Sequence, residues 1–143
     1  MAISVVEASG VAVSSECLSE YQTLKLGKKL KYIIFTLNKD NTEIIVEKTS
    51  NSHEYEDFLA DLPEGDCRYA VYDYEYELEE GGKRNKLAFV AWSPDDARVK
   101  RKMLFASSKD AIRRSLVGIA VEIQGTDLSE VAFETVVAKL GRK

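Results

Sequence analysis

Apolar residues recur along this chain with two different periods, and each period indicates a different kind of element. The run Lys31–Leu37 holds four apolar residues in succession and predicts a strand. A polar turn over Asn38–Asn41 follows, and Thr42–Lys48 predicts the returning strand. The tyrosine-rich segment Cys67–Leu78 predicts a third strand, and Gly81 and Gly82 follow it. Two shorter apolar runs predict two more strands, over Leu87–Trp92 and Ile119–Ile123.

A period of three to four residues predicts two helices in the first half of the chain. Ser14 or Ser15 is expected to cap the first helix, which runs to Leu26 and ends at Gly27. Asn51, with Glu54 three residues later, is expected to cap a short second helix, which Pro63 ends. The apolar stripe of that second helix consists of Tyr55, Phe58, Leu59 and Leu62.

Two more helices are predicted in the second half. Ser93 followed by Pro94 is typical of a helix start, and this long helix is expected to reach about Leu116. The last helix is expected to be capped by Asp127, paired with a glutamate three residues later, or by Thr126. Its apolar stripe consists of Phe133, Val136, Val137 and Leu140.

The resulting order of elements is α-β-β-α-β-β-α-β-α, which predicts an α/β fold of the α+β type. A mixed sheet with helices on both faces is the architecture that this alternation favours. Residues 1–13 carry few structure-forming signals and are expected to form a flexible N-terminal arm. The remaining residues, 14–143, suit one domain of ordinary size.

Composition and charge narrow the function classes. Apolar residues make up 45% and charged residues 31% of the chain, which is a globular balance. The net charge is −4, but basic residues gather between Arg98 and Lys102 and acidic residues between Glu75 and Glu80. An acidic protein with one basic face is a poor general nucleic-acid binder and a better candidate for docking onto an acidic partner surface.

The sequence offers few groups for chemistry. His53 is the only histidine and is expected on the surface, so a multi-histidine metal site is excluded. The eight glycines form no phosphate-binding loop. Cys17 and Cys67 sit among apolar neighbours and are expected to be buried free thiols, as in a reducing compartment. We therefore predict no enzyme activity, no metal and no cofactor. We also expect neither a transmembrane helix nor a secretory signal, because every apolar run is short.

The long third helix carries the most informative pattern. At 100° per residue, four basic residues fall within about 60° of one another and form a stripe, namely Arg98, Lys102, Lys109 and Arg113. The core-facing positions are expected to be Val99, Met103 and Ala106 in the first half, and Ile112 and Leu116 in the second. The phase slips near Ser107-Ser108, where serine hydroxyls are expected to bond back to the preceding turn and bend the helix. By itself the basic stripe also suits an ordinary solvated helix face.

Several motifs resemble the ADF/cofilin family, and its fungal members above all. The similar segments are Ala8–Val13, Leu62-Pro63, Cys67–Tyr74, Trp92–Asp95, Lys102-Met103, Ala106–Arg114 and Gln124–Asp127. The resemblance implies the ADF-homology fold, a five- or six-stranded mixed sheet between helices. It also implies a protein that binds monomeric and filamentous actin, preferring the ADP form, changes filament twist, severs filaments and promotes depolymerisation. A coactosin-like or glia-maturation-factor-like regulator is the alternative.

The resemblance also implies the binding residues. Monomer and filament binding would share Ser9, Gly10, Lys100, Lys102, Lys109, Asp110, Arg113 and Arg114. Filament binding would add Lys83, Arg84 and Lys86 in a strand-connecting loop, and Lys139 and Arg142 in the last helix. Ser9 is a candidate regulatory phosphorylation site. Two departures from fungal relatives are the extension Met1–Glu7 and Ala138 in place of an acidic residue.

Family likeness further implies the partners and the compartment. We expect phosphoinositide headgroups to compete with actin, and we expect no nucleic-acid partner. A monomer at the cytoplasmic actin cytoskeleton is expected, with the nucleus as a second compartment.

Overall fold

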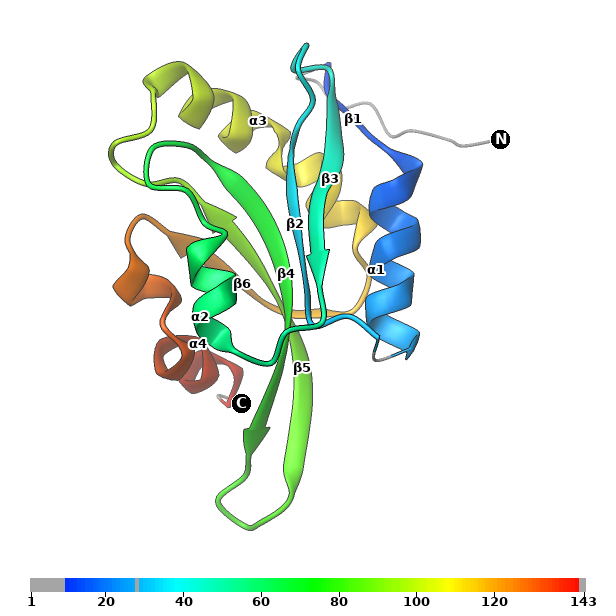
Figure 1. Cartoon of the computed structure of the whole chain (residues 1–143), viewed down its shortest axis with the longest axis vertical. Coiled ribbons are helices and arrows are strands. Elements are labelled where there is room, and N and C mark those ends of the chain that lie inside the picture. The colour runs from blue at the N-terminus through cyan, green and yellow to red at the C-terminus, as the bar shows by residue number, and fades with distance from the viewer. Residues whose placement is uncertain (1–9, 28, 142–143) are drawn as a thin grey trace.

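The computed structural model describes residues 10–27 and 29–141, and its centre is a six-stranded mixed sheet (Figure 1). The strands are β1 (Ala12–Val13), β2 (Tyr32–Leu37), β3 (Glu43–Ser50), β4 (Arg68–Glu77), β5 (Lys83–Trp92) and β6 (Ile119–Gly125). They lie in the order β1-β3-β2-β4-β5-β6. The β1–β3 and β5–β6 pairs are parallel and the others antiparallel, so the mixed sheet predicted from the sequence is confirmed.

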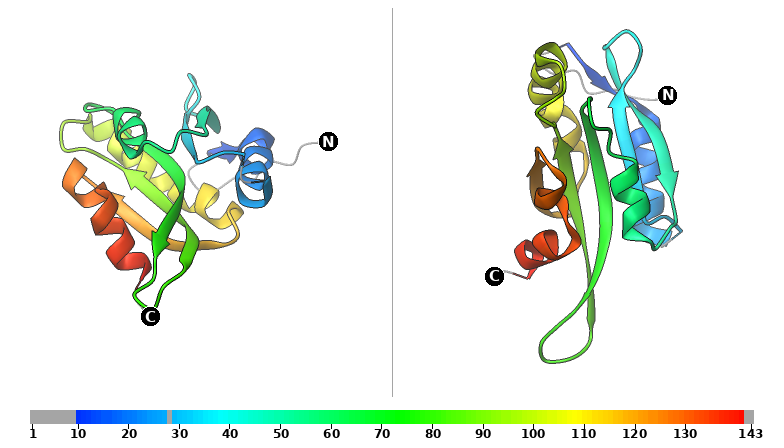
Figure 2. Two further views of the ribbon diagram at one scale, coloured as in Figure 1. Left: turned by 60° about the horizontal axis from the view of Figure 1, so that its bottom comes forward. Right: turned by 60° about the vertical axis from the view of Figure 1, so that its left-hand side comes forward.

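Helices cover both faces of this sheet. They are α1 (Ser15–Gly27), α2 (Tyr55–Ala60), α3 (Val99–Ser115), the short 3-10 helix η1 (Leu128–Val131) and α4 (Phe133–Leu140). One buried cluster joins α1 and α3 to the sheet, and a second joins α2, η1 and α4 to the opposite face (Figures 1 and 2). Within the described ranges, no helix is long and apolar enough to cross a membrane.

Successive residues of β4 divide between the two clusters. Tyr69 and Val71 pack on the side of α1 and α3, whereas Ala70, Tyr72 and Tyr74 pack on the side of α2 and α4. Both faces of the strand are therefore buried, which accounts for the nearly continuous apolar and aromatic run in the sequence. The far ends of β4 and β5 extend beyond the helices as a projecting hairpin (Figure 2).

The structure corrects the predicted N-terminal region and the start of the second helix. Ala12 and Val13 form β1 beside β3, although the sequence predicted a flexible arm over 1–13; residues 1–9 lie outside the described residues. The capping pair expected at 51–54 does not form. Instead, the hydroxyl of Ser52 accepts a hydrogen bond from the Glu54 amide, and α2 begins at Tyr55.

Two further boundaries differ near the basic segments. Helix α3 begins at Val99 and not at Ser93, because the Ser93 amide still donates to the Gly125 carbonyl and so prolongs the sheet. Strand β5 begins four residues before the predicted Leu87, at Lys83, because its polar first residues pair in register with β4. The pairing, which the sequence pattern did not show, gives these polar residues an extended backbone.

Candidate functional site: the outer face of α3 and the β4–β5 hairpin

Helix α3 presents apolar side chains to solvent. Val99 and Met103 are 71% and 66% exposed. The expectation that these two residues face the core is therefore wrong, and Ala106 is exposed as well. Because exposed large apolar residues that gather on one helix face are a mark of interaction sites, we include this strip in the candidate site.

The core-facing stripe of α3 runs through other positions. Phe105, Ser108 and Ile112 are buried, and Arg101 precedes them by one turn on the same side. An arginine in a core-facing position disguises the apolar period, so the sequence pattern assigned the first half of the helix to the wrong phase. The missed signal was the spacing i, i+4, i+7, i+11 that starts at Arg101.

Three sets of polar contacts hold α3 against the rest of the fold. Near its N-terminus, the Arg101 guanidinium binds the Asp66 carboxylate, with Nε to Oδ1 at 2.9 Å. In its middle, the Tyr69 hydroxyl of β4 donates to the Phe105 carbonyl. Just after its end, the Val117 carbonyl accepts from the Tyr21 hydroxyl at 2.6 Å and from Lys25 Nζ at 2.8 Å, both on α1. The outer face is thereby presented on a helix fixed along its length.

The predicted residues shared by monomer and filament binding flank the apolar strip on α3. Lys100, Asp110 and Arg114 are exposed, while Lys102, Lys109 and Arg113 are half-buried. Both half-buried lysines also have partners within the fold. Lys102 Nζ donates to the Asp95 carbonyl at 2.8 Å, and Lys109 Nζ lies 3.4 Å from Glu122 Oε1 on β6. The structure thus brings the helical members of this set together on one element.

The N-terminal members of the set fall at the edge of the described chain. Gly10 is exposed and has a positive φ of 83°, a conformation that favours glycine, and it precedes β1, which packs beside α3. Ser9 lies outside the described residues.

The residues predicted for filament binding gather at the projecting hairpin and α4. Lys83, Arg84 and Lys86 belong to β5 itself and not to a strand-connecting loop, which corrects that expectation. Arg84 and Lys86 line a cleft of about 550 Å³ between the hairpin and α4. Lys139 is exposed on α4. Arg142 lies outside the described residues.

Lys86 has a structural partner in α4. Its Nζ donates to the Leu140 carbonyl at 2.9 Å, at the C-terminal end of that helix. Carbonyls at a helix C-terminus lack partners within the helix and favour a cation. Lys86 therefore links the hairpin to α4, in addition to lining the cleft.

The pKa of Asp66 reflects the hydrogen bonds that its carboxylate accepts from the two arginines near it. Partial burial raises the pKa of Asp66, but hydrogen bonds from Arg101 and Arg68 outweigh this effect and lower the pKa to about 2.

Both cysteines are buried and unbridged, as predicted, and burial raises the pKa of the Cys17 thiol to about 11. A thiol that stays protonated at neutral pH is a poor nucleophile.

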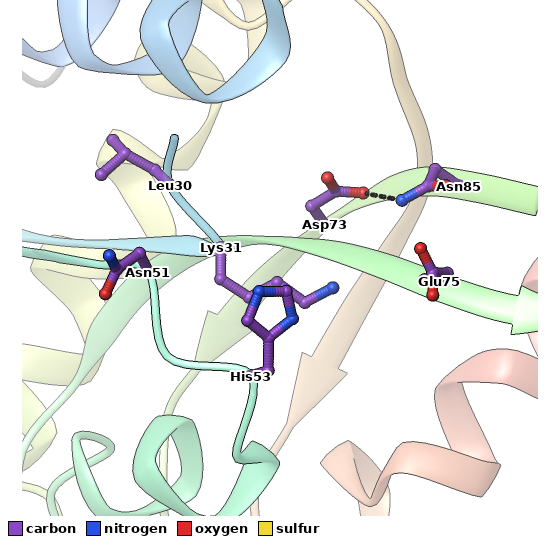
Figure 3. Close-up of a pocket in the computed structure, with 7 residues that line it drawn as sticks. All are labelled: Leu30, Lys31, Asn51, His53, Asp73, Glu75 and Asn85. Atoms are coloured by element: carbon purple, nitrogen blue, oxygen red, sulfur yellow. Dashed lines mark hydrogen bonds between the residues drawn. The ribbon is translucent and has the colours of Figure 1, made fainter. Parts of the chain in front are cut away.

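A small pocket of about 90 Å³, lined in part by Asp73 and Glu75 of β4 and Asn85 of β5, holds none of the predicted binding residues (Figure 3). His53 and Lys31 line it, and across it Asp73 accepts a hydrogen bond from Asn85 Nδ2 at 3.2 Å. His53 is exposed, as the sequence predicted. Among the described residues, no group of three or more histidines, cysteines or carboxylates is placed to hold a metal ion.

Comparison with known proteins identifies relatives of this chain. A family model described as Cofilin/tropomyosin-type actin-binding protein matches residues 10–141. Cofilin of Mycosarcoma maydis is 63% identical over 134 residues, which cover 94% of this chain and 96% of that protein. Cofilin of Schizosaccharomyces pombe is 56% identical over 135 residues, which cover 94% of this chain and 98% of that protein.

Solved structures show the same fold. A crystal structure of Streptomyces griseoflavus cofilin has a TM-score of 0.89 and 65% sequence identity, and the match covers 93% of this chain and 98% of that one. Coactosin from Entamoeba histolytica has a TM-score of 0.77 at 18% identity, with 92% and 95% of the two chains covered. The second likeness concerns the fold alone.

Proposed function

Because the chain belongs to the family of cofilin/tropomyosin-type actin-binding proteins, we propose that it binds monomeric and filamentous actin through the outer face of α3 and promotes filament depolymerisation. The observation that carries this proposal is the strip of Val99 and Met103, exposed by 71% and 66% between basic residues. Docking removes this strip from water, at about 25 cal/mol per Å² of apolar surface. The surrounding positive charges steer the encounter with an acidic partner.

A second surface extends the proposal to filaments. Lys83 and Arg84 stand on the projecting hairpin, and Lys139 stands on the neighbouring α4. These residues lie on different elements from the α3 strip, so a filament, which offers two subunits at once, engages both surfaces. We propose that a monomer engages only α3 and the segment that precedes β1.

Filament remodelling by such a protein requires binding alone. A ligand that binds one filament twist better than another shifts the filament toward that twist, by no more than its differential affinity. We propose that this protein prefers ADP-bound subunits, and that the mechanical mismatch between decorated and bare segments leads to severing. The cofilin relatives at 56–63% identity favour this function over a coactosin-like or glia-maturation-factor-like one.

Two further proposals concern the regulation of actin binding. A phosphoinositide headgroup carries the negative charge that suits the basic flank of α3, and we propose that it competes with actin there. Phosphorylation of Ser9 would add about −1.5 to −2 charges beside an acidic actin surface. We propose that this modification weakens actin binding. We also propose that the protein is a monomer and that it acts on cytoplasmic actin, with the nucleus as a second compartment.

The α3 surface is tested by a double substitution, Lys109→Ala with Arg113→Ala. Both side chains are half-buried at the flank of the helix. The substitutions remove the charge-assisted contacts proposed between these side chains and actin. Co-sedimentation with filaments and binding to monomers are therefore expected to be abolished. The melting temperature is expected to stay within a few degrees of the wild-type value, since Lys109 forms just one ion pair, at 3.4 Å, within the part of the chain that the structure describes.

The matched control is Lys29→Ala, which removes a lysine far from α3 in the sequence and is expected to leave binding unchanged. Co-sedimentation of the double variant at the wild-type level contradicts the α3 assignment. In the same assay Ser9→Glu is expected to weaken binding, and vesicles with phosphoinositide are expected to release the wild-type protein from actin. Undiminished binding by Ser9→Glu would reject charge control at that serine.

A further inference from the structure

Arg101 belongs to the basic cluster of the sequence, yet its side chain turns inward. Only 25% of the side chain is exposed. Its Nε and Nη2 bind the two carboxylate oxygens of Asp66 at 2.9 and 3.2 Å, and its Nη1 binds the side-chain oxygen of Asn41 at 3.0 Å. The guanidinium also lies 5.0 Å from the ring centre of Phe105, one turn along α3. All three nitrogens of the guanidinium thus form hydrogen bonds within the fold.

Asp66 joins this contact to the sheet. Its carboxylate also accepts from Arg68 Nη1 at 2.8 Å and from the Cys67 amide at 2.8 Å. Arg68 in turn binds both carboxylate oxygens of Glu47 on β3, at 2.9 and 3.1 Å. Bidentate arginine–carboxylate pairs restrict orientation as well as adding free energy. The first turns of α3 are therefore coupled to β3 and to the start of β4.

Asn41 connects Arg101 of α3 to a further part of the fold. It lies in the β2–β3 turn with a positive φ of 59°, a conformation that asparagine tolerates. The residue at the N-cap of α3, Arg98, makes no side-chain hydrogen bond with the helix. Without a capping side chain, the orientation of the first turns depends on lateral contacts such as those of Arg101.

We propose that Arg101 is a positioning residue for actin binding. Acting through Asp66, it holds the first two turns of α3 so that Val99, Lys100 and Met103 face the partner as one surface. The proposal rests on the proposed function of the α3 strip and goes beyond it, because neither Arg101 nor Asp66 contacts the partner. An arginine that touched actin directly would behave differently, since releasing it from Asp66 would leave it available to the partner.

The test compares Arg101→Gln, Asp66→Asn and the double variant in a titration of fluorescently labelled actin monomers. Each single substitution is expected to weaken affinity by about tenfold. The double variant is expected to bind no more weakly than the weaker single variant, because each substitution already breaks the Arg101–Asp66 contact on which the positioning depends. The matched control is Lys100→Gln, the exposed neighbour of Arg101, whose effect is expected to multiply with that of Asp66→Asn.

Opposite results overturn the proposal. If Asp66→Asn binds actin as well as or better than the wild-type protein, Arg101 contacts actin itself or plays no part. Effects of Arg101→Gln and Asp66→Asn that multiply in the double variant show two independent roles and also reject the proposal. Thermal unfolding of each variant identifies any that is unfolded at the assay temperature, and Arg101→Lys, which keeps the charge, then replaces Arg101→Gln.

Hydrogen exchange provides a readout that needs no actin. In Asp66→Asn, the amides in the first two turns of α3 are expected to exchange faster, while those around Ile112 keep their protection. Unchanged exchange in the first turns overturns the positioning role even if affinity falls. If the wild-type protein fails to bind actin, the proposed function fails, and the exchange result still decides whether Arg101 holds the helix.

Discussion

At the scale of the residue, Ser108 is the side chain whose surroundings least match its chemistry. It is fully buried on α3, and its hydroxyl lacks a hydrogen-bond partner among the described residues. The neighbouring Ser107 is exposed, and its hydroxyl donates to the Leu104 carbonyl at 3.1 Å. The predicted bond back to the preceding turn is therefore confirmed for Ser107 and is wrong for Ser108. An unsatisfied buried hydroxyl costs about 1–3 kcal/mol.

Ser108→Ala is therefore expected to stabilise the protein. The substitution removes the hydroxyl without opening a large cavity, so the free energy of unfolding is expected to rise by about 1 kcal/mol, or a few degrees in melting temperature. Ser107→Ala serves as the control and is expected to change the free energy of unfolding by less than about 0.5 kcal/mol. Urea unfolding of both variants measures the two effects. A clear loss of stability in Ser108→Ala would mean that the hydroxyl is satisfied in solution.

At the scale of the element, the β4–β5 hairpin combines a projecting end with an anchored base. Lys83 Nζ lies 3.6 Å from Glu75 Oε1, and both side chains are about half exposed or more, at 64% and 47%. Exposed ion pairs of this kind contribute little to stability. Lys86, nearer the base, is tied to the end of α4 through the Leu140 carbonyl. Substitutions at the projecting end should thus change binding without changing the fold.

Lys83→Ala with Arg84→Ala tests this division of labour. The double variant is expected to keep its affinity for actin monomers, because the α3 strip is untouched, and to lose filament decoration and severing. Co-sedimentation, monomer titration and imaging of single filaments measure the three activities. Equal losses for monomers and filaments would show that the hairpin does not form a separate filament surface. A melting temperature close to that of the wild type excludes unfolding as the cause.

At the scale of the whole molecule, one ionic cluster joins elements that are distant in the chain. Asp66 precedes β4, Arg101 lies on α3, and Arg68 continues the contact to Glu47 on β3. The pKa of Asp66 is about 2 in the folded protein, below its ordinary value of 3.8, because the hydrogen bonds from the two arginines outweigh the opposing effect of burial. A carboxyl with a depressed folded pKa stabilises the fold above its unfolded pKa, and this stabilisation is lost as the pH falls through the folded pKa.

The stability of the wild type relative to Asp66→Asn is therefore expected to depend on pH. The difference in free energy of unfolding should be constant from neutral pH to about 5 and should shrink between about pH 4 and 2. Urea unfolding at a series of pH values measures it. A difference that stays constant down to pH 2 would mean that the Asp66 carboxylate has no depressed pKa in the folded protein.

The sequence by itself determined the elements whose signals are local. The apolar run of β2, the tyrosine-rich β4 and the apolar stripe of α4 depend on neighbours a few residues apart, and all three appear where they were predicted, within a few residues. The mixed sheet with helices on both faces followed from the order of those elements. The short motifs also sufficed for the family, because a run such as Ala106–Arg114 is contiguous in the chain.

Only the tertiary structure decided which face of α3 meets the partner. Arg101 occupies a core-facing position because Asp66, 35 positions earlier in the chain, receives its guanidinium there. No local period encodes a contact between residues so far apart, and the apolar residues Val99 and Met103 were consequently assigned to the core. Strand β1 is two residues long, too short to show a period, and it exists through its pairing with β3. In each case the deciding free energy comes from a partner distant in sequence, which the chain meets only when it has folded.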